Sequence, residues 1–381
     1  MSKGLASLAS VLTQPGVIDP AEPIIEAPKE TKKTSDKITT KADKFAALRA
    51  VEKALNKQLD TTMSIVRLGD KVGIPIPSIS TGLPSLDYDV LGCGGVPRGR
   101  ILEIYGPESS GKTTLCLHII AQEQKNTENI CAIVDAEHAL DATYAASLGV
   151  NVEELIVSQP SSGEDALETV ESLIDSGCVS IIVVDSVAAL VPRAELDGEM
   201  GDASMGLQAR LMSQACRKLI GKASVKGVCV IFVNQLRDKI GVMYGSPETT
   251  TGGKALKFYA SVRLDVRRRE VIGPKDHPIG HQLRIKSVKN KCGVPLRETT
   301  INLLYGTGID TFSDFIAYAA KLGVIEQKGA WFYFEKENVA QGLTALVDRV
   351  RLDNVMYEKI KAGVDKARKD QQDAESKETK S

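Results

Sequence analysis

Residues 106–113 read Gly-Pro-Glu-Ser-Ser-Gly-Lys-Thr and follow the apolar run at 101–105. A strand, a glycine-rich loop and a helix start, in this order, direct several backbone N–H groups at one anion. The Lys112 ammonium would reach the terminal phosphates, and the Thr113 hydroxyl would ligate Mg²⁺. The pattern therefore predicts a site for a nucleoside triphosphate. Its expected lining is Gly106, Pro107, Glu108, Ser109, Ser110, Gly111, Lys112, Thr113 and Thr114.

Polar residues also follow three other apolar runs, at the ends of expected strands. Asp185 ends Ile-Ile-Val-Val, and its carboxylate would hold Mg²⁺ directly or through water, unless it only caps the next helix. Glu137 is the best candidate to orient and deprotonate an attacking water; a structural acid in the loop is the alternative. The Gln235 amide would bind a γ-phosphate and release it after hydrolysis, which would make it a switch for the next loop. In an open α/β sheet, ligands bind at these carboxyl ends of the strands.

A long loop follows Gln235 and is rich in Gly, Thr and Pro, yet it contains apolar side chains. A structureless loop of this length is usually functional or disordered. Its cations would meet phosphates, and its apolar side chains would wedge between bases or stack on them. A mobile lid over the nucleotide is the alternative. The expected nucleic-acid contacts in this region are Arg237, Lys239, Ile240, Tyr244, Gly252 and Gly253.

A second glycine-rich loop occupies residues 195–206 and includes Met205. Arg210 and Arg217 follow it, seven residues apart, so they share one face of the next expected helix. Two cations on one face suit a phosphate backbone. An ordinary solvated helix surface is the alternative.

Basic residues crowd two neighbouring strands nearer the C-terminus. Lys286, Lys289 and Lys291 stand on one, and residues 267–269 of the strand before it are all arginine. Like charges this close repel one another unless an anion lies nearby. A nucleotide held by the next subunit or a nucleic-acid backbone would supply that anion. The alternative is a solvated sheet edge that discourages aggregation.

A sheet must position these residues. Apolar runs alternate with helical segments and occupy residues 101–105, 130–134, 155–158, 179–184 and 228–233. Near-continuous Ile and Val runs are typical of parallel strands covered on both faces, so the fold class is α/β with a mostly parallel sheet. The alternating segments 260–267 and 282–289 predict antiparallel strands added at the sheet's edge. A smaller α/β unit begins near Phe312.

A separate amphipathic helix precedes this sheet. Thr40 is its expected N-cap, and apolar residues recur at three- and four-residue spacing. This face comprises Phe45, Leu48, Val51, Leu55 and Leu59. It needs a partner, which would be either its own chain or a neighbouring copy.

Composition adds mainly exclusions. The 381 residues carry 48 basic and 49 acidic side chains, so any basic surface must be local. No apolar stretch is long enough to span a membrane. The first 40 residues carry no arginine and include Asp19, Glu22 and Glu26, which argues against signal and transit peptides. The seven cysteines form no C-x-x-C pair, and several lie in apolar runs. Buried free thiols in a reducing compartment are expected.

Six runs together resemble the RecA recombinase family. They include Ile-Tyr-Gly-Pro-Glu-Ser-Ser-Gly-Lys-Thr-Thr-Leu and Asp-Ala-Glu-His-Ala-Leu-Asp, and the resemblance extends over residues 42–335. Their positions are 104–115, 135–141, 183–190, 239–245, 247–253 and 257–265. The combination is far more specific than a phosphate-binding loop alone.

The resemblance implies an ATP- and Mg²⁺-dependent filament on single-stranded DNA that pairs with homologous double-stranded DNA and exchanges strands. It implies a cytoplasmic protein of a bacterium or phage-infected cell, or an organellar one, with loading or regulatory proteins as further partners.

The same resemblance assigns roles to matching residues. Glu137 would be the catalytic base, Asp185 the magnesium-binding acid and Gln235 the γ-phosphate sensor, while Tyr144 would stack on the adenine. Lys289 and Lys291 would complete the ATP site of the neighbouring subunit. Residues 197–206 and 236–251 would be the DNA-binding loops. The helix at 42–59 would be the polymerisation arm, with Phe258 at the same interface.

Three departures accompany this resemblance. The first 40 residues are additional, and Lys254 stands where the family usually has Asn, which would add a contact to the DNA backbone. The tail from residue 363 holds five acids and five bases, whereas the family usually ends acidic. The expected organisation is a disordered extension (1–40), a helical arm (41–75), an ATPase core (76–310), a small α/β domain (311–362) and a disordered tail (363–381).

Two other functions stay open on the residues alone. A ring-forming helicase would use the same core, although the helical arm and the lysine-bearing strand favour a filament. A regulatory ATPase without a DNA role is the second, and the apolar loop after Gln235 argues against it.

Overall fold

The computed structural model of the chain describes residues 40–59, 76–199, 206–238 and 248–378. The chain divides into two compact units, Met1–Arg67 and Leu68–Ser381. Helix α1 (Lys41–Leu59) belongs to the first. The Asp43 amide donates to Thr40 Oγ1 at 3.2 Å, which confirms the predicted N-cap. Leu48 and Val51 on α1 are each 49% exposed.

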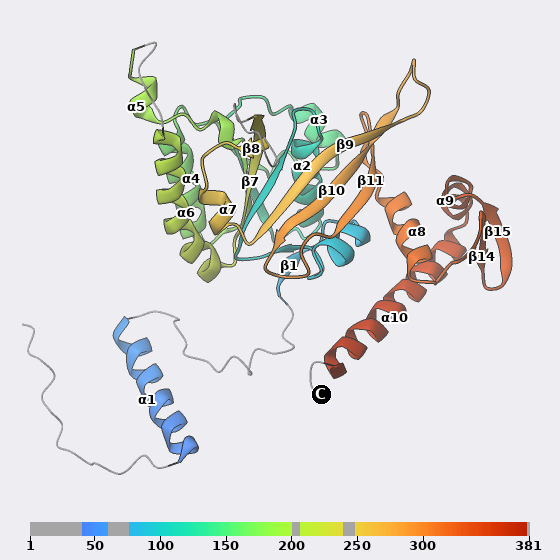
Figure 1. Ribbon diagram of the computed structural model, residues 1–381, viewed down its shortest axis with the longest axis horizontal. Coiled ribbons are helices and arrows are strands. Elements are labelled where there is room, and N and C mark those ends of the chain that lie inside the picture. Colours follow the sequence, from blue (N-terminus) through green and yellow to red (C-terminus); the bar gives the residue numbers. More distant parts are fainter. Residues whose placement is uncertain (1–39, 60–75, 200–205, 239–247, 379–381) are drawn as a thin grey trace, which may run out of the picture. The chain divides into compact units, whose positions relative to one another are not determined.

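The second unit is built on a ten-stranded sheet with the order β12-β11-β10-β9-β3-β7-β6-β4-β5, and β8 pairs with β7 (Figure 1). The run from β9 to β5 is parallel throughout, which confirms the predicted fold class. The strands are β3 (Ile101–Gly106), β4 (Ile130–Asp135), β5 (Ile156–Ser158), β6 (Val179–Asp185), β7 (Cys229–Asp238), β8 (Glu248–Thr250), β9 (Val262–Ile272), β10 (Gly280–Asn290), β11 (Glu298–Leu304) and β12 (Gly308–Ile309).

Helices cover both faces of this sheet because alternate residues of each strand point to opposite sides. On β4, Ile133 joins the core under α2 (Lys112–Glu123), whereas Val134 joins the core under α4 (Gly163–Ser176) and α6 (Leu207–Lys226). Figure 1 shows α4 and α6 side by side on their face of the sheet. The remaining elements of this region are β1 (Ser78–Ile79), η2 (Ser85–Val90), β2 (Val96–Pro97), α3 (Ala142–Ser147), η3 (Val187–Ala189), α5 (Arg193–Leu196) and α7 (Ala255–Tyr259).

The prediction of two antiparallel edge strands is wrong for the first of them. Strand β9 pairs parallel with β3 and lies inside the sheet, and only β10 runs antiparallel to β9. Alternation of apolar and polar residues along a strand indicates which of its faces is buried, but it does not indicate whether the strand pairs parallel or antiparallel. The connection through β8 and α7 returns the chain to the start of β3, where β9 begins in parallel.

The C-terminal domain has its own core, around Ile316, Phe332 and Leu346. It contains α8 (Thr311–Lys321), β13 (Glu326–Lys328), β14 (Trp331–Phe334), β15 (Glu337–Gln341), α9 (Leu343–Leu352) and α10 (Asn354–Glu378). The buried Asp314 carboxylate of α8 accepts a hydrogen bond from the Ser85 amide at 3.1 Å, which joins this domain to η2.

The predicted disordered tail is wrong for residues 363–378, because α10 continues to Glu378. Val364 is buried in the C-terminal core, and the Arg368 guanidinium lies 3.2 Å from the ring centroid of Tyr88. These tertiary contacts stabilise a sequence whose composition alone is typical of a disordered segment. Within the described part of the chain, no helix has the length and apolar character needed to cross a membrane.

Candidate active site

The glycine-rich loop joins β3 to α2, as predicted. Gly106 is the last residue of β3, and a Cβ there would lie 2.0 Å from the Val266 carbonyl oxygen, so no other residue fits. Lys112 is the first residue of α2, and its Nζ donates to the Pro107 carbonyl at 2.6 Å, across the loop. Burial lowers the pKa of Lys112. The Ser110 hydroxyl is buried without a hydrogen-bond partner among the described residues. Unsatisfied donors around one loop fit a bound phosphate.

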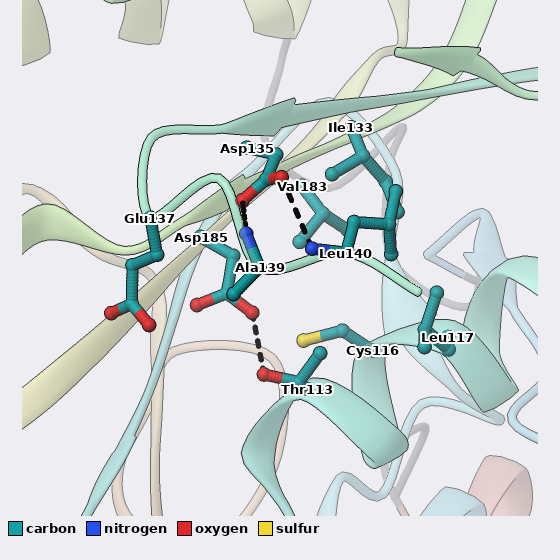
Figure 2. Close-up of a pocket in the computed structure, with 10 residues that line it drawn as sticks. All are labelled: Thr113, Cys116, Leu117, Ile133, Asp135, Glu137, Ala139, Leu140, Val183 and Asp185. Atoms are coloured by element: carbon teal, nitrogen blue, oxygen red, sulfur yellow. Dashed lines mark hydrogen bonds between the residues drawn. The ribbon is translucent and has the colours of Figure 1, made fainter. Parts of the chain in front are cut away.

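Thr113 and Asp185 meet beside this loop. The Thr113 Oγ1 donates to Asp185 Oδ2 at 2.6 Å (Figure 2). Burial is the main cause that raises the pKa of Asp185 to about 6. Mg²⁺ prefers oxygen ligands and is usually held by one or two protein groups together with substrate phosphates, so this pair fits it.

Glu137 lies on the other side of Asp185 from Thr113 in Figure 2. Its Oε1 accepts a hydrogen bond from Gln235 Nε2 at 2.9 Å and another from the Ser186 hydroxyl. The carboxylate is exposed at the end of β4, where it can meet a water molecule. The structure thus brings Thr113, Glu137, Asp185 and Gln235 together. The sequence did not single out Ser186, although it directly follows Asp185.

The predicted adenine partner lies beside the phosphate loop. Tyr144 lines a pocket of about 280 Å³ that the loop itself also lines. The Tyr144 hydroxyl is hydrogen-bonded to Thr114 Oγ1 at 2.9 Å. His281 and Tyr305 line the same pocket. Sequence reasoning missed both because they come from β10 and from the end of β11, far away in the chain.

The loop after Gln235 has more structure than predicted. Strand β7 continues to Asp238, and β8 pairs with it antiparallel, with Arg237 opposite Thr249. The exposed Arg237 places its guanidinium 3.5 Å from Gln235 Oε1. Lys239, Ile240 and Tyr244 lie outside the described residues. The base of this loop is therefore a strand pair that begins at Leu236, directly after the sensor residue.

A buried polar network anchors the same strand pair. Asn234 is fully buried, and its Nδ2 donates to Glu103 Oε1 at 2.9 Å and to the Thr251 carbonyl at 3.2 Å. Arg263 forms an ion pair with the other oxygen of Glu103. This network links β3, the strand before the phosphate loop, to Thr251, which directly follows β8 at the end of the second predicted DNA-binding loop. Apart from the position of Asn234 beside Gln235, no local pattern indicates this network.

The glycines that end this loop have different surroundings. Gly252 is buried, has φ +73°, and would place a Cβ 2.9 Å from Val187 Cγ1. Its amide donates to Gln208 Oε1 at 3.2 Å, so in this structure it packs against the protein. Gly253 and Lys254 are exposed next to it.

The first DNA-loop candidate is described only in part. Met205 lies outside the described residues, as do 200–204. Arg210 and Arg217 are both exposed on α6, seven residues apart on one face as predicted. The structure is compatible with either a phosphate contact or an ordinary helix surface there.

Lys289 and Lys291 lie at the far end of β10 from the pocket. A Cβ on Gly111 of the loop would lie 3.4 Å from Leu283 Cδ1 of β10, and six residue steps of strand separate Leu283 from Lys289, which corresponds to about 20 Å and exceeds the length of a lysine side chain. Neither lysine can therefore reach the phosphate loop of its own chain. Lys289 Nζ donates to the Lys257 and Phe258 carbonyls at 2.8 and 2.9 Å, and Lys291 is exposed.

Acids within the chain already pair with two of the six cations of the expected cluster. Arg267 is paired with Glu248 and Asp265, and the Lys286 ammonium lies 3.7 Å from Glu298. The argument that these strands require an external anion is wrong for these two residues. It still applies to the other four cations, which are Arg268, Arg269, Lys289 and Lys291.

Comparison with known proteins agrees with this geometry. The family described as the RecA N-terminal domain matches residues 45–310. Protein RecA of Chloroherpeton thalassium is 53% identical over 324 residues, which cover 85% of this chain and 90% of that protein. Protein RecA of Chlorobium chlorochromatii is 54% identical over 318 residues (83% and 89%), and that of Brucella canis is 55% identical over 299 residues (78% and 81%). This chain therefore belongs to the RecA family, the DNA-dependent ATPases of recombination and DNA repair.

Proposed function

We propose that this chain binds ATP and Mg²⁺ at interfaces between adjacent subunits of a filament on single-stranded DNA, and that it exchanges this strand with homologous double-stranded DNA. Binding of the phosphates would fall to the backbone of residues 107–111, Lys112 and the Ser110 hydroxyl. Thr113 and Asp185 would hold the metal, and Tyr144 would contact the base. When bound, Mg²⁺ neutralises charge on the phosphate oxygens.

The observation that carries the proposal is the shared contact of Glu137 with Gln235 beside Asp185. Glu137 would orient the attacking water and accept its proton. Gln235 would exchange its bond to Glu137 for one to the γ-phosphate. Because Gln235 directly precedes the first paired residue of β7 and β8, this exchange would bias the loop beyond that strand pair toward DNA binding.

The interface position of ATP is supported by the length of β10. Lys289 and Lys291 lie too far from their own phosphate loop, and they share one region with the exposed Phe258, which is 69% accessible. A nucleotide bound by a neighbouring subunit would supply an anion for them. Helix α1, on which Leu48 and Val51 are exposed, would dock on another subunit of the filament, and the arm would comprise residues 41–75.

The test compares Glu137→Gln with Glu128→Gln, which alters an exposed acid outside the site. Glu137→Gln should retain ATP-dependent binding to single-stranded DNA while turnover falls by about a hundredfold or more. Glu128→Gln should behave as the parent in both assays. Normal turnover in Glu137→Gln would remove the residue from this role.

Electron microscopy with ATP and single-stranded DNA separates the proposal from the ring-shaped motor. Open helical filaments are expected, and closed rings would contradict the proposal. Salt titration of DNA binding addresses the regulatory ATPase, since phosphate contacts require log K to fall as log salt rises.

A further inference from the structure

Two cysteines that are far apart in the sequence lie close together in the core domain. Cys93 lies in the turn after η2, and Cys292 lies just beyond the end of β10. The Cys93 thiol donates to the Gly95 carbonyl at 3.2 Å, and its sulfur also lies within hydrogen-bonding reach of the Cys292 sulfur. Both thiols are free and partly exposed.

Backbone contacts hold the two turns together. Asn290 Nδ2 donates to the Leu91 carbonyl at 2.9 Å, and Asn290 Oδ1 accepts from the Cys292 amide at 2.8 Å. A Cβ on Gly293 would lie 2.3 Å from the Leu91 carbonyl oxygen, so the turns touch at a residue that has to be glycine. The surrounding packing therefore holds the two turns, and with them the backbones of Cys93 and Cys292, next to each other.

We propose that Cys93 and Cys292 form a modification site that hydrogen peroxide oxidises reversibly to an intramolecular cystine. The Cys292 thiolate attacks one peroxide oxygen, which gives a sulfenic acid and releases hydroxide. The Cys93 sulfur then attacks the sulfenic sulfur, and its proton leaves with the hydroxyl group as water. Two thiols and one peroxide become one disulfide and two waters, and the two electrons reduce the O–O bond.

The surroundings make Cys292 the attacking group. The hydrogen bond from Cys93 is the first cause that lowers the pKa of Cys292 to about 7, and the positive charges of Arg100 and Lys291 act in the same direction. The same contact raises the pKa of Cys93. The other partly or fully buried thiols lack this contact: burial raises the pKa of Cys131 to about 12, for example. Thiolate character and access together select one pair among seven cysteines.

The bridge also has a functional consequence, which rests on the proposed role of Lys289 and Lys291 in the neighbouring ATP site. Lys289 is held by the carbonyls at the end of α7, so it must leave them to reach a phosphate on another subunit. A covalent link at Cys292 would fix the end of β10 in its present position. Oxidation should therefore lower DNA-dependent ATPase activity.

The chemical test uses the full-length reduced protein. After exposure to peroxide and alkylation of remaining thiols, digestion without reductant should yield a linked peptide pair that contains Cys93 and Cys292, and dithiothreitol should release it. The exposed Cys178 serves as the internal reference, and Cys178→Ser should leave the link unchanged. Absence of the link, or oxidation of Cys292 no faster than that of Cys178, overturns the proposal.

The functional test compares oxidised protein with the double variant Cys93→Ser/Cys292→Ser. Peroxide should lower the ATPase rate of the parent by about tenfold, with recovery in dithiothreitol, and leave the double variant unaffected. A complete link with unchanged ATPase overturns the proposed restraint on β10 and leaves the oxidation site standing. If the reduced parent protein has no ATPase activity but still forms the disulfide, the proposed function is wrong and the oxidation site is not.

Discussion

Gln235 Nε2 donates to Glu137 Oε1 at 2.9 Å, so the expected γ-phosphate sensor and the expected base are joined by one hydrogen bond. The Ser186 hydroxyl donates to the same oxygen. A phosphate that recruits Gln235 must compete with this contact. When Gln235 moves to the phosphate, the same movement would free the Glu137 carboxylate to bind a water molecule.

Gln235→Ala should uncouple the two binding sites. ATP affinity should change little because the phosphate loop is intact. The gain in single-stranded DNA affinity that ATP produces should fall by about tenfold, within the usual range of coupling free energies. Fluorescence anisotropy with and without ATP measures this gain. Gln341→Ala, in exposed strand β15, is the matched control, and an undiminished gain in Gln235→Ala would exclude the switch.

The raised pKa of Asp185 predicts a pH dependence of metal binding. Below about pH 6 the folded protein holds a proton on this carboxyl, and Mg²⁺ must displace it. The apparent Mg²⁺ affinity should fall by about tenfold per pH unit below 6 and level off above it.

Titration of Mg²⁺-dependent ATP binding across this range is the measurement. Asp185→Asn should bind weakly at every pH and show only the part of the dependence that comes from ATP itself. If the Mg²⁺ affinity of the parent protein changes with pH in the same way as that of Asp185→Asn, the titrating group is on ATP and is not Asp185.

Mixing two inactive variants tests the composite ATP site. Lys289→Ala and Lys112→Ala should each lose about a hundredfold or more in ATPase rate. In a mixed filament, a Lys289→Ala subunit supplies an intact phosphate loop and a Lys112→Ala neighbour supplies an intact Lys289. Roughly a quarter of the interfaces in an equal mixture would be complete, because the contact is head-to-tail. ATPase of the mixture should therefore exceed the sum of the two variants, and simple additivity would place Lys289 outside the neighbour's site.

Lys254 should contribute one contact to the DNA backbone. It is exposed beside Gly253, where α7 begins. Lys254→Ala should reduce the slope of log K against log salt by about 0.7 on single-stranded DNA. Lys275→Ala, which removes an exposed cation between β9 and β10, should leave the slope unchanged. An equal effect of both variants would indicate general attraction.

Helix α10 should stabilise the C-terminal domain. Val364 is 3% exposed in its core, and Val364→Ala should lower the free energy of unfolding by about 2 kcal/mol. Lys369→Ala, on the exposed side of the same helix, should change it little. Chemical denaturation followed by circular dichroism compares the two. Equal stability would mean that α10 is not anchored as described.

Much of the site could be predicted from local sequence. The order of apolar strand, glycine-rich loop and Lys-Thr determines a phosphate cradle, because each part contributes through its own backbone or its nearest neighbours. Asp185, Glu137 and Gln235 end apolar runs, and parallel strands necessarily bring such ends to one edge of the sheet.

Contacts between distant segments could not be predicted in this way. Neither the pairing of β9 with β3 nor the burial of Gly252 against Val187 leaves a local pattern. The folding of residues 363–378 as a helix depends on Tyr88 and the C-terminal core, while their composition alone is that of a solvated tail. By itself, the sequence determined the residues that handle a triphosphate and the type of sheet that presents them. Only the tertiary structure decided which groups share a hydrogen bond, which lysines lie out of reach of their own site and which two thiols meet, because these depend on distances between strands that are far apart in the chain.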